Sequence, residues 1–141
     1  MVARDKAREA LVQLSINVCP TYLYVTIEEF GKCLMQGFEI HVKHYTLHHI
    51  LDAMHRANVL QTGLIDRSLD SISRLIMEEE FGKLGEEKEV TETKKKLYKE
   101  SKVRRATLTY EIISQHINFK DSFEKLIQPL IEKLESNPTQ L

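Results

Sequence analysis

The spacing of the apolar residues is the strongest constraint on the fold, because it repeats every three or four positions along most of the chain. The pattern is clearest near the C-terminal end, where one helical face would carry Phe119, Phe123, Leu126, Ile127, Leu130, Ile131 and Leu134. This spacing matches the 3.6-residue turn of an α-helix rather than the alternation of a β-strand. Glycine and proline number only 5 and 3 in 141 residues, which leaves few tight turns for a β fold. The sequence therefore predicts an all-α fold.

Residues 1–82 carry four stretches with this spacing, which we expect to form two antiparallel helical hairpins with short connections. Pro20 should begin the second helix, and residues 61–63 should form the loop before the fourth. Each stretch has one face that we predict to point inward. The first carries Ala7, Ala10, Leu11, Leu14 and Val18, and the second carries Leu23, Ile27, Phe30 and Leu34. The third carries Ile40, His44, Leu47, Leu51 and Met54, and the fourth carries Ile65, Leu69, Ile72 and Ile76.

Residues 83–105 differ in character, because charged residues replace the apolar pattern. Seven glutamates lie between 78 and 93, and seven basic residues follow: Lys94, Lys95, Lys96, Lys99, Lys102, Arg104 and Arg105. So few apolar side chains can bury little surface. We therefore interpret 83–105 as a charged helix or linker, partly disordered over about 84–105.

Apolar spacing returns in residues 106–136, which predict a C-terminal helical hairpin. Asn118 should cap its second helix by accepting an amide hydrogen bond, and Pro129 should kink that helix. Residues 137–141 should form a disordered tail. About seven helices in series, none able to bury its apolar face alone, favour a HEAT-like α-solenoid. A compact helical bundle is the competing architecture.

The charge balance limits what the chain can bind. The net charge is −1, so a surface that is basic overall is excluded, and nucleic-acid binding would need a local patch. The basic run 94–105 is the candidate, since its cations could neutralise RNA phosphates while Tyr98 stacks on a base. A solvated charged linker and a nuclear-localisation signal are the alternative interpretations.

No motif points to catalysis, a cofactor or a metal. His41, His44 and His48 share one helical face, but no C-x-x-C or H-E-x-x-H pattern accompanies them. We therefore expect His41 and His48 to pack or hydrogen-bond between helices. Cys19 and Cys33 lie in apolar stretches and are predicted to be small buried residues in a reducing compartment. No apolar run approaches the ~18 residues of a membrane span, which predicts a soluble protein of the cytosol or nucleus.

Several short motifs, in order along the chain, resemble one family. Residues 36–48 read QGFEIHVKHYTLH, residues 62–66 read TGLID, Phe81-Gly82 is followed by EEKE at 86–89, and residues 126–130 read LIQPL. Together they resemble the very large HEAT-repeat proteins associated with the U-three small nucleolar RNA (protein 20, also called down-regulated in metastasis). Gln36 stands where that family's first motif has a basic residue.

The resemblance implies a non-catalytic scaffold: an internal segment of a nucleolar small-subunit processome component that supports processing of the small-subunit rRNA precursor. Its implied partners are processome proteins, neighbouring repeats of a larger chain and pre-rRNA or small nucleolar RNA, with no membrane and no small-molecule substrate. A direct RNA-binding module that uses 94–105 and a generic helical protein-protein adaptor remain as alternatives. A solenoid segment without its neighbours should expose an apolar patch. We expect it either at Leu11, Leu14 and Val18 or at Leu130, Ile131 and Leu134.

Overall fold

The computed structural model describes residues 2–17, 20–33, 39–81 and 105–136. In these ranges the chain forms helices only, which confirms the predicted all-α fold class. The α-helices are α1 (Val2–Asn17), α2 (Leu23–Lys32), α3 (Glu39–Arg56), α4 (Leu69–Phe81), α7 (Ala106–His116) and α8 (Phe119–Ser136), with 3-10 turns η1 (Pro20–Tyr22) and η2 (Asp66–Ser68). The charged stretch 84–104 and the tail lie outside the described residues, so the division at 83, 106 and 137 stays a prediction.

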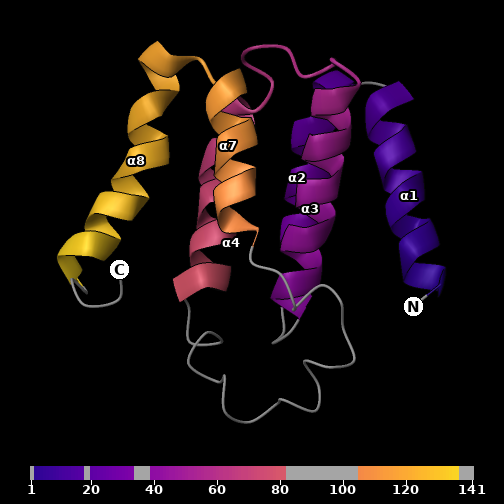
Figure 1. The fold of residues 1–141 in the computed structure, drawn as a ribbon, viewed down its shortest axis with the longest axis horizontal. Helices are drawn as coiled ribbons and strands as arrows, with labels where there is room; N and C mark the ends of the chain where they lie inside the picture. The colour runs from indigo at the N-terminus through magenta and orange to yellow at the C-terminus, as the bar shows by residue number, and fades with distance from the viewer. Residues whose placement is uncertain (1, 18–19, 34–38, 82–104, 137–141) are drawn as a thin grey trace, which may run out of the picture.

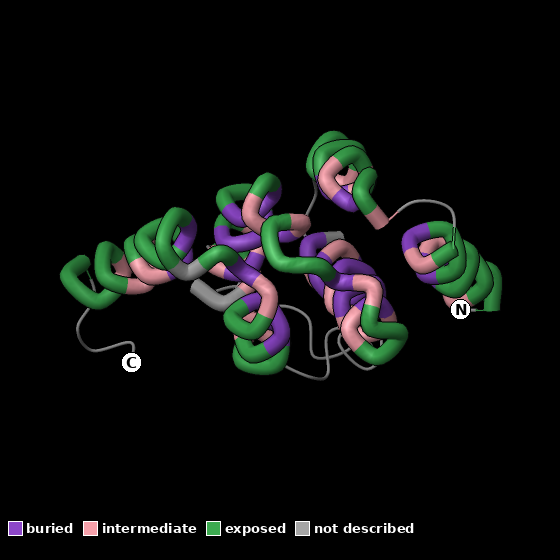
Figure 2. Tube along the Cα trace, turned by 90° about the horizontal axis from the view of Figure 1, so that it is seen from above, coloured by how far each residue is buried: buried purple, intermediate pink, exposed green. Residues whose placement is uncertain are grey.

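Successive described helices alternate in direction, and the array is extended rather than round (Figure 1). Seen from above, α3 and α7 lie on one side, α2 and α4 on the other, and α1 and α8 at the two ends (Figure 2). Besides the α3–α4 hairpin, α1 packs on α3, α3 on α7, α2 on α4 and α4 on α8. Each of these pairings apart from the hairpin joins helices of the same direction, which gives the fold a solenoid-like form.

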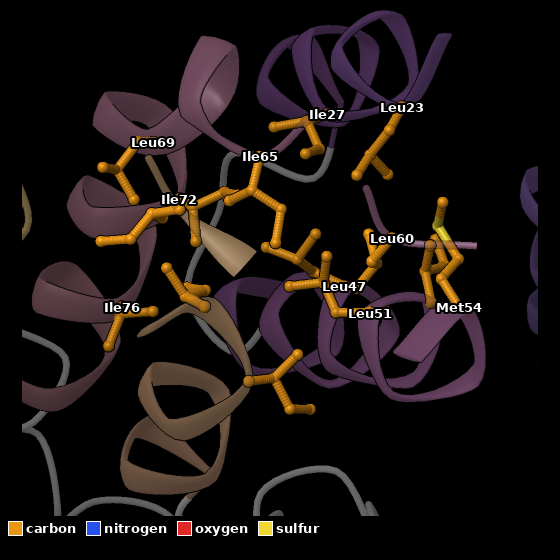
Figure 3. Packing of buried hydrophobic residues seen from close by; sticks show 14 of the residues in the cluster. Leu23, Ile27, Leu47, Leu51, Met54, Leu60, Ile65, Leu69, Ile72 and Ile76 are labelled. Carbon is orange, nitrogen blue, oxygen red and sulfur yellow. The ribbon is translucent and has the colours of Figure 1, made fainter. Parts of the chain in front are cut away.

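One apolar core runs through the array, between the two rows of helices (Figure 3). Side chains with essentially no exposure come from α3, from the loop before α4, from α4 itself and from α7: Ile50, Leu51, Met54, Ile65, Leu69, Ile72 and Ile113. Burying a Leu or Ile side chain contributes roughly 1.5–3 kcal/mol, so this cluster holds the rows together. The predicted inward faces of the third and fourth helices are confirmed.

The end of α3 and the following loop have the geometry that their residues favour. Asn58 takes a positive φ of 58°, and the amide of Val59 donates to the carbonyl of Met54 at 3.1 Å. This is a Schellman ending, in which Asn tolerates the left-handed conformation. Gly63 has φ 98° in the predicted loop, a value that side chains rarely allow.

Three local predictions were wrong. α1 buries Arg8, Val12 and Ser15, and not the predicted face, because Leu14 is 53% exposed. Cys33 is exposed at the end of α2, whereas burial was expected; Cys19 lies outside the described residues. The side chain of Asn118 donates to Asp121 at 2.9 Å, whereas it was predicted to accept.

Asp66 ties the loop before α4 to the start of α8. Its Oδ1 accepts the backbone amide of Asn118 at 2.8 Å and also the hydroxyl of Ser122. The Asp66 carboxylate thereby pairs a backbone amide and a hydroxyl at the start of α8, more than fifty residues away in the sequence. Pro129 lies inside α8 as predicted, while the kink itself remains a prediction.

None of the described helices is long and apolar enough to cross a membrane alone. One bent pair of described segments, Val2–Asn17 with Pro20–Lys32, meets the length and composition of a membrane span when the two are counted together.

Candidate functional site on the polar face of α3

Helix α3 has two faces of opposite character. Its apolar face places Leu47, Leu51 and Met54 in the core. Beside that face, the histidines and Tyr45 point toward α1, α4 and α7. Residues three and four apart lie on one side of a helix, so the spacing of His41, His44 and His48 brings them together. These three histidines, with Glu79 of α4 and Thr109 of α7, are called here the polar seam.

Thr109 is the centre of the polar seam. Its buried hydroxyl donates to the carbonyl of Arg105 at 3.0 Å. A hydroxyl has only one proton to donate, so its other neighbours must donate to it. His44 Nε2 lies 2.9 Å and His48 Nδ1 lies 3.1 Å from the same oxygen. Both rings are therefore assigned a proton on the nitrogen that faces Thr109.

Glu79 joins α4 to the same histidines. Its Oε1 lies 2.8 Å from His41 Nδ1, and its Oε2 contacts His44 Nδ1. The expected packing of His41 and His48 between helices is confirmed, since both hydrogen-bond residues of other helices. The polar seam thus pairs the Thr109 hydroxyl and one ring nitrogen of each histidine, while the Nδ1 of His44 stays without a hydrogen bond.

Burial lowers the pKa of His44 to about 3, and the neighbouring His48, Arg105 and His41 act in the same direction. Burial also lowers the pKa of His48. The His44 ring is therefore neutral at pH 7 and donates through Nε2 only. Among the described residues, the buried Nδ1 of His44 finds no hydrogen-bond partner.

A second histidine contact joins the ends of α3 and α7. His55 Nδ1 lies 2.8 Å from His116 Nε2, and burial lowers the pKa of His116, as does the neighbouring His55. His55 faces His116 as His48 faces Thr109, and both pairs are 61 residues apart. The constant separation means that α3 and α7 run parallel and in a fixed register.

Tyr45 lies beneath two arginines at the junction of α1, α3 and α7. The guanidinium carbon of Arg8 lies 4.3 Å, and that of Arg105 3.9 Å, from the centre of the buried Tyr45 ring. Arg8 is itself buried, and it donates to Thr46 at 3.2 Å and to Asp5 at 2.8 Å. The cation–π contacts and these hydrogen bonds explain how a buried arginine is tolerated.

The basic run is described at one residue only. Arg105, which precedes α7, is half-buried and reaches the Tyr45 ring, so its cation takes part in packing. Six of the predicted RNA-contact residues lie outside the described residues: Lys94, Lys95, Lys96, Lys99, Lys102 and Arg104. RNA contact by the run therefore stays a prediction.

Sequence reasoning missed three residues of this face: Arg8, Glu79 and Thr109. A signal existed for two of them. Glu79 follows Ile76 at the spacing of the α4 apolar stripe, and Thr109 precedes Ile113 by one turn, so both fall on inward faces. For Arg8 no signal existed, because an arginine in the first helix looks like a solvent-exposed residue.

The described residues contain no group of three or more His, Cys, Asp or Glu side chains arranged to hold a metal ion. They do contain a hollow of about 280 Å³ between α2, α3 and α4, with an open mouth and a mixed lining. Its walls are Ile27, Phe30, Gly31, Ile40, Lys43, Leu47, Ser71, Arg74, Leu75 and Glu78.

Both ends of the array expose apolar side chains. On α8, Ile131 is 40% and Leu134 46% exposed, and Leu14 is exposed on α1. Leu11 and Leu130 are half-buried, and Val18 lies outside the described residues. The predicted patch is therefore present on α8 and partly on α1.

Comparison with known proteins assigns the family. The family model described as the U3 small nucleolar RNA-associated protein 20 domain matches residues 1–140. Proteins named U3 small nucleolar RNA-associated protein 20 match from two yeasts, with 34% identity over 91% of this chain in Schizosaccharomyces pombe and 36% over 90% in Saccharomyces cerevisiae. The chain spans 5% of the length of each relative, and no solved structure matches. The chain therefore belongs to the U3 small nucleolar RNA-associated protein 20 family.

Proposed function

We propose that this chain is a non-catalytic scaffold segment of a nucleolar small-subunit processome component and supports processing of the small-subunit rRNA precursor. The observation that carries the proposal is the family match over residues 1–140, together with relatives named for their association with U3 small nucleolar RNA. The relatives are far longer, so the segment would act within a larger HEAT-type solenoid.

The mechanism we propose is geometric. A scaffold must hold its helices at fixed separations, so that surfaces far apart in sequence face their partners together. The α3–α7 pairing supports this role, because the hydrogen bonds to Thr109 and the His55–His116 contact fix the register at two levels. Hydrogen bonds have narrow geometric limits, whereas apolar packing tolerates sliding more readily.

Crosslinking in cells tests this function. The tagged full chain is crosslinked to RNA and purified, and the bound RNA is sequenced beside RNA from an untagged strain. We expect U3 small nucleolar RNA and the small-subunit rRNA precursor to be enriched, and processome proteins to co-purify. Purification with neither of these RNAs nor processome proteins would refute the assignment.

A second candidate function is direct RNA binding by residues 94–105. Seven basic residues in twelve positions support it, because each phosphate contact releases counterions and strengthens binding. Such contact would read phosphates and shape rather than base sequence.

The test of this second function compares two triple variants at Lys94, Lys95 and Lys96. Alanine removes the charges, whereas arginine keeps them and serves as the matched control. We expect binding to a structured RNA to fall with added salt, to weaken in the alanine variant and to persist in the arginine variant. Equal binding by both variants would exclude these lysines as phosphate contacts and leave a protein-only scaffold.

A further inference from the structure

Thr107 stands in a distinctive sequence at the start of α7. Residues 104–108 read Arg-Arg-Ala-Thr-Leu, so two arginines lie three and two positions before the threonine and a leucine directly follows it. The Thr107 side chain is exposed, and Leu108 is 47% exposed beside it. Among the residues that the structure describes, none forms a side-chain hydrogen bond with Thr107 that would account for this arrangement.

We propose that Thr107 is a phosphoacceptor for a protein kinase that selects basic residues before its target. Kinases discriminate between substrates largely by charge pattern, and acidic pockets favour arginine because its guanidinium pairs with carboxylates in a two-pronged geometry. Arg104 and Arg105 supply the two cations in the sequence, and Arg105 must leave the Tyr45 ring to reach a kinase. The exposed Leu108 supplies an apolar group for the site that follows the phosphoacceptor.

The position of Thr107 also allows a kinase to reach it. Kinases bind their target as an extended segment, so the first turn of α7 must open. Within the described residues, that turn is closed by the Arg105 carbonyl, which accepts the amide of Thr109 at 2.9 Å and its hydroxyl at 3.0 Å. Opening the turn breaks these two bonds and the Arg105–Tyr45 contact. It leaves the buried Ile112 and Ile113 in place, because helix ends fray before helix interiors.

The chemical step transfers one phosphoryl group. The Thr107 hydroxyl oxygen attacks the γ-phosphorus of ATP, and the bond from that phosphorus to the bridging oxygen breaks. ADP leaves, and the hydroxyl proton passes to a carboxylate of the kinase. No other reactant is needed.

A phosphate on Thr107 would supply the negative charge and the hydrogen-bond acceptors that the start of α7 lacks. The capping residue is Arg105, which makes no side-chain capping bond, and the first turn holds no acidic residue. A phosphate adds about −1.5 to −2 charges and accepts hydrogen bonds, which favours a helix N-terminus. It would also follow Arg104 and Arg105 in the sequence and compete with RNA for their cations, a consequence that rests on the second candidate function above.

The test incubates the purified full chain with ATP and the catalytic subunit of a kinase that selects arginine at these positions, followed by mass spectrometry of peptides. We expect one phosphate per chain, on Thr107. Incorporation should be lost in Thr107→Ala, retained in Thr107→Ser and much slower in Arg104→Gln. Thr109 is an internal control, because it lies two residues away but is buried and lacks arginines at the same offsets.

Absence of phosphate, or labelling that persists in Thr107→Ala, would overturn the assignment. Circular dichroism of each variant verifies that it folds. The capping effect has its own readout, because amides in the first turn of α7 should exchange hydrogen more slowly in the phosphorylated chain. Unchanged or faster exchange would refute that effect. The assay contains no RNA, so its failure would leave the proposed scaffold function untouched.

Discussion

His44 on α3 hydrogen-bonds Thr109 on α7, with Nε2 2.9 Å from Oγ1 across 65 residues of sequence. The same oxygen receives His48 at 3.1 Å and donates its only proton to the Arg105 carbonyl at 3.0 Å. One hydroxyl thus organises the contact between two parallel helices. A group with three partners in a buried interface should be sensitive to replacement.

Thr109→Val tests this relationship, because valine keeps the shape and removes the oxygen. Two ring nitrogens would lose their acceptor, and each buried unsatisfied group costs about 1–3 kcal/mol. We expect the free energy of unfolding, measured by urea denaturation, to fall by roughly 2–4 kcal/mol. Thr107→Val is the matched control, since Thr107 is exposed on the same turn and should change stability by about 0.5 kcal/mol or less. Equal effects of the two variants would contradict the assigned role of Thr109.

Acid should destabilise the protein through His44. Its pKa is about 3 when folded and near 6.5 when unfolded, so the unfolded chain binds more protons between these values. Stability is therefore complete above about pH 6.5 and falls as the pH drops, by up to about 1.4 kcal/mol per unit for this ring. Urea denaturation from pH 7.5 to 4.5 measures the slope, which should be smaller in His44→Gln. An unchanged slope in that variant would show that other groups cause the acid sensitivity.

The sequence predicted the inward faces of α3 and α4 well. α3 and α4 bury the expected leucines and isoleucines, because many apolar residues at helical spacing leave one way to cover them. It failed for α1, whose buried face contains Arg8. An arginine enters a core only when partners satisfy it, and its partners Thr46 and Tyr45 lie almost forty residues away. Spacing in one sequence cannot reveal such a partner.

For the candidate site, the sequence predicted which residues share a helical face but not which residues they contact. The spacing of His41, His44 and His48 predicted a shared face, and their packing between helices followed. Their partner Thr109 was not identified, because that required knowing that α3 and α7 are parallel neighbours. Parallel neighbours are separated by a whole intervening helix and a charged stretch, so local pattern carries no information on their register.

The arginine contacts with Tyr45 should stabilise the α1–α3 junction. We expect a double-mutant cycle with Arg8→Met and Tyr45→Leu to give a coupling of about 1–2 kcal/mol, because the pair is buried. Arg67 lies 3.9 Å from the Tyr24 ring but is exposed, and provides the matched pair. Its coupling in the cycle Arg67→Met and Tyr24→Leu should be about 0.5–1 kcal/mol. Stronger coupling in the exposed pair would argue against burial as the cause.

The outer face of α8 should make the isolated chain self-associate. Ile131 and Leu134 are 40% and 46% exposed, whereas Leu126 of the same helix packs in the core. Exposed apolar groups on adjacent turns favour contact with another apolar surface. We expect sedimentation velocity to show association that increases with concentration, and the double variant Ile131→Gln with Leu134→Gln to remain monomeric.

Two controls separate this effect from unfolding. Glu132→Gln with Glu135→Gln changes exposed polar positions on the same turns and should leave association unchanged. Leu126→Ala should instead lower the free energy of unfolding by about 2–5 kcal/mol, since it opens a cavity between α4 and α8. The Ile131 and Leu134 variant should keep its stability within about 1 kcal/mol, because both side chains are already partly exposed to water. A wild-type chain that stays monomeric at every concentration would show that this face does not associate on its own.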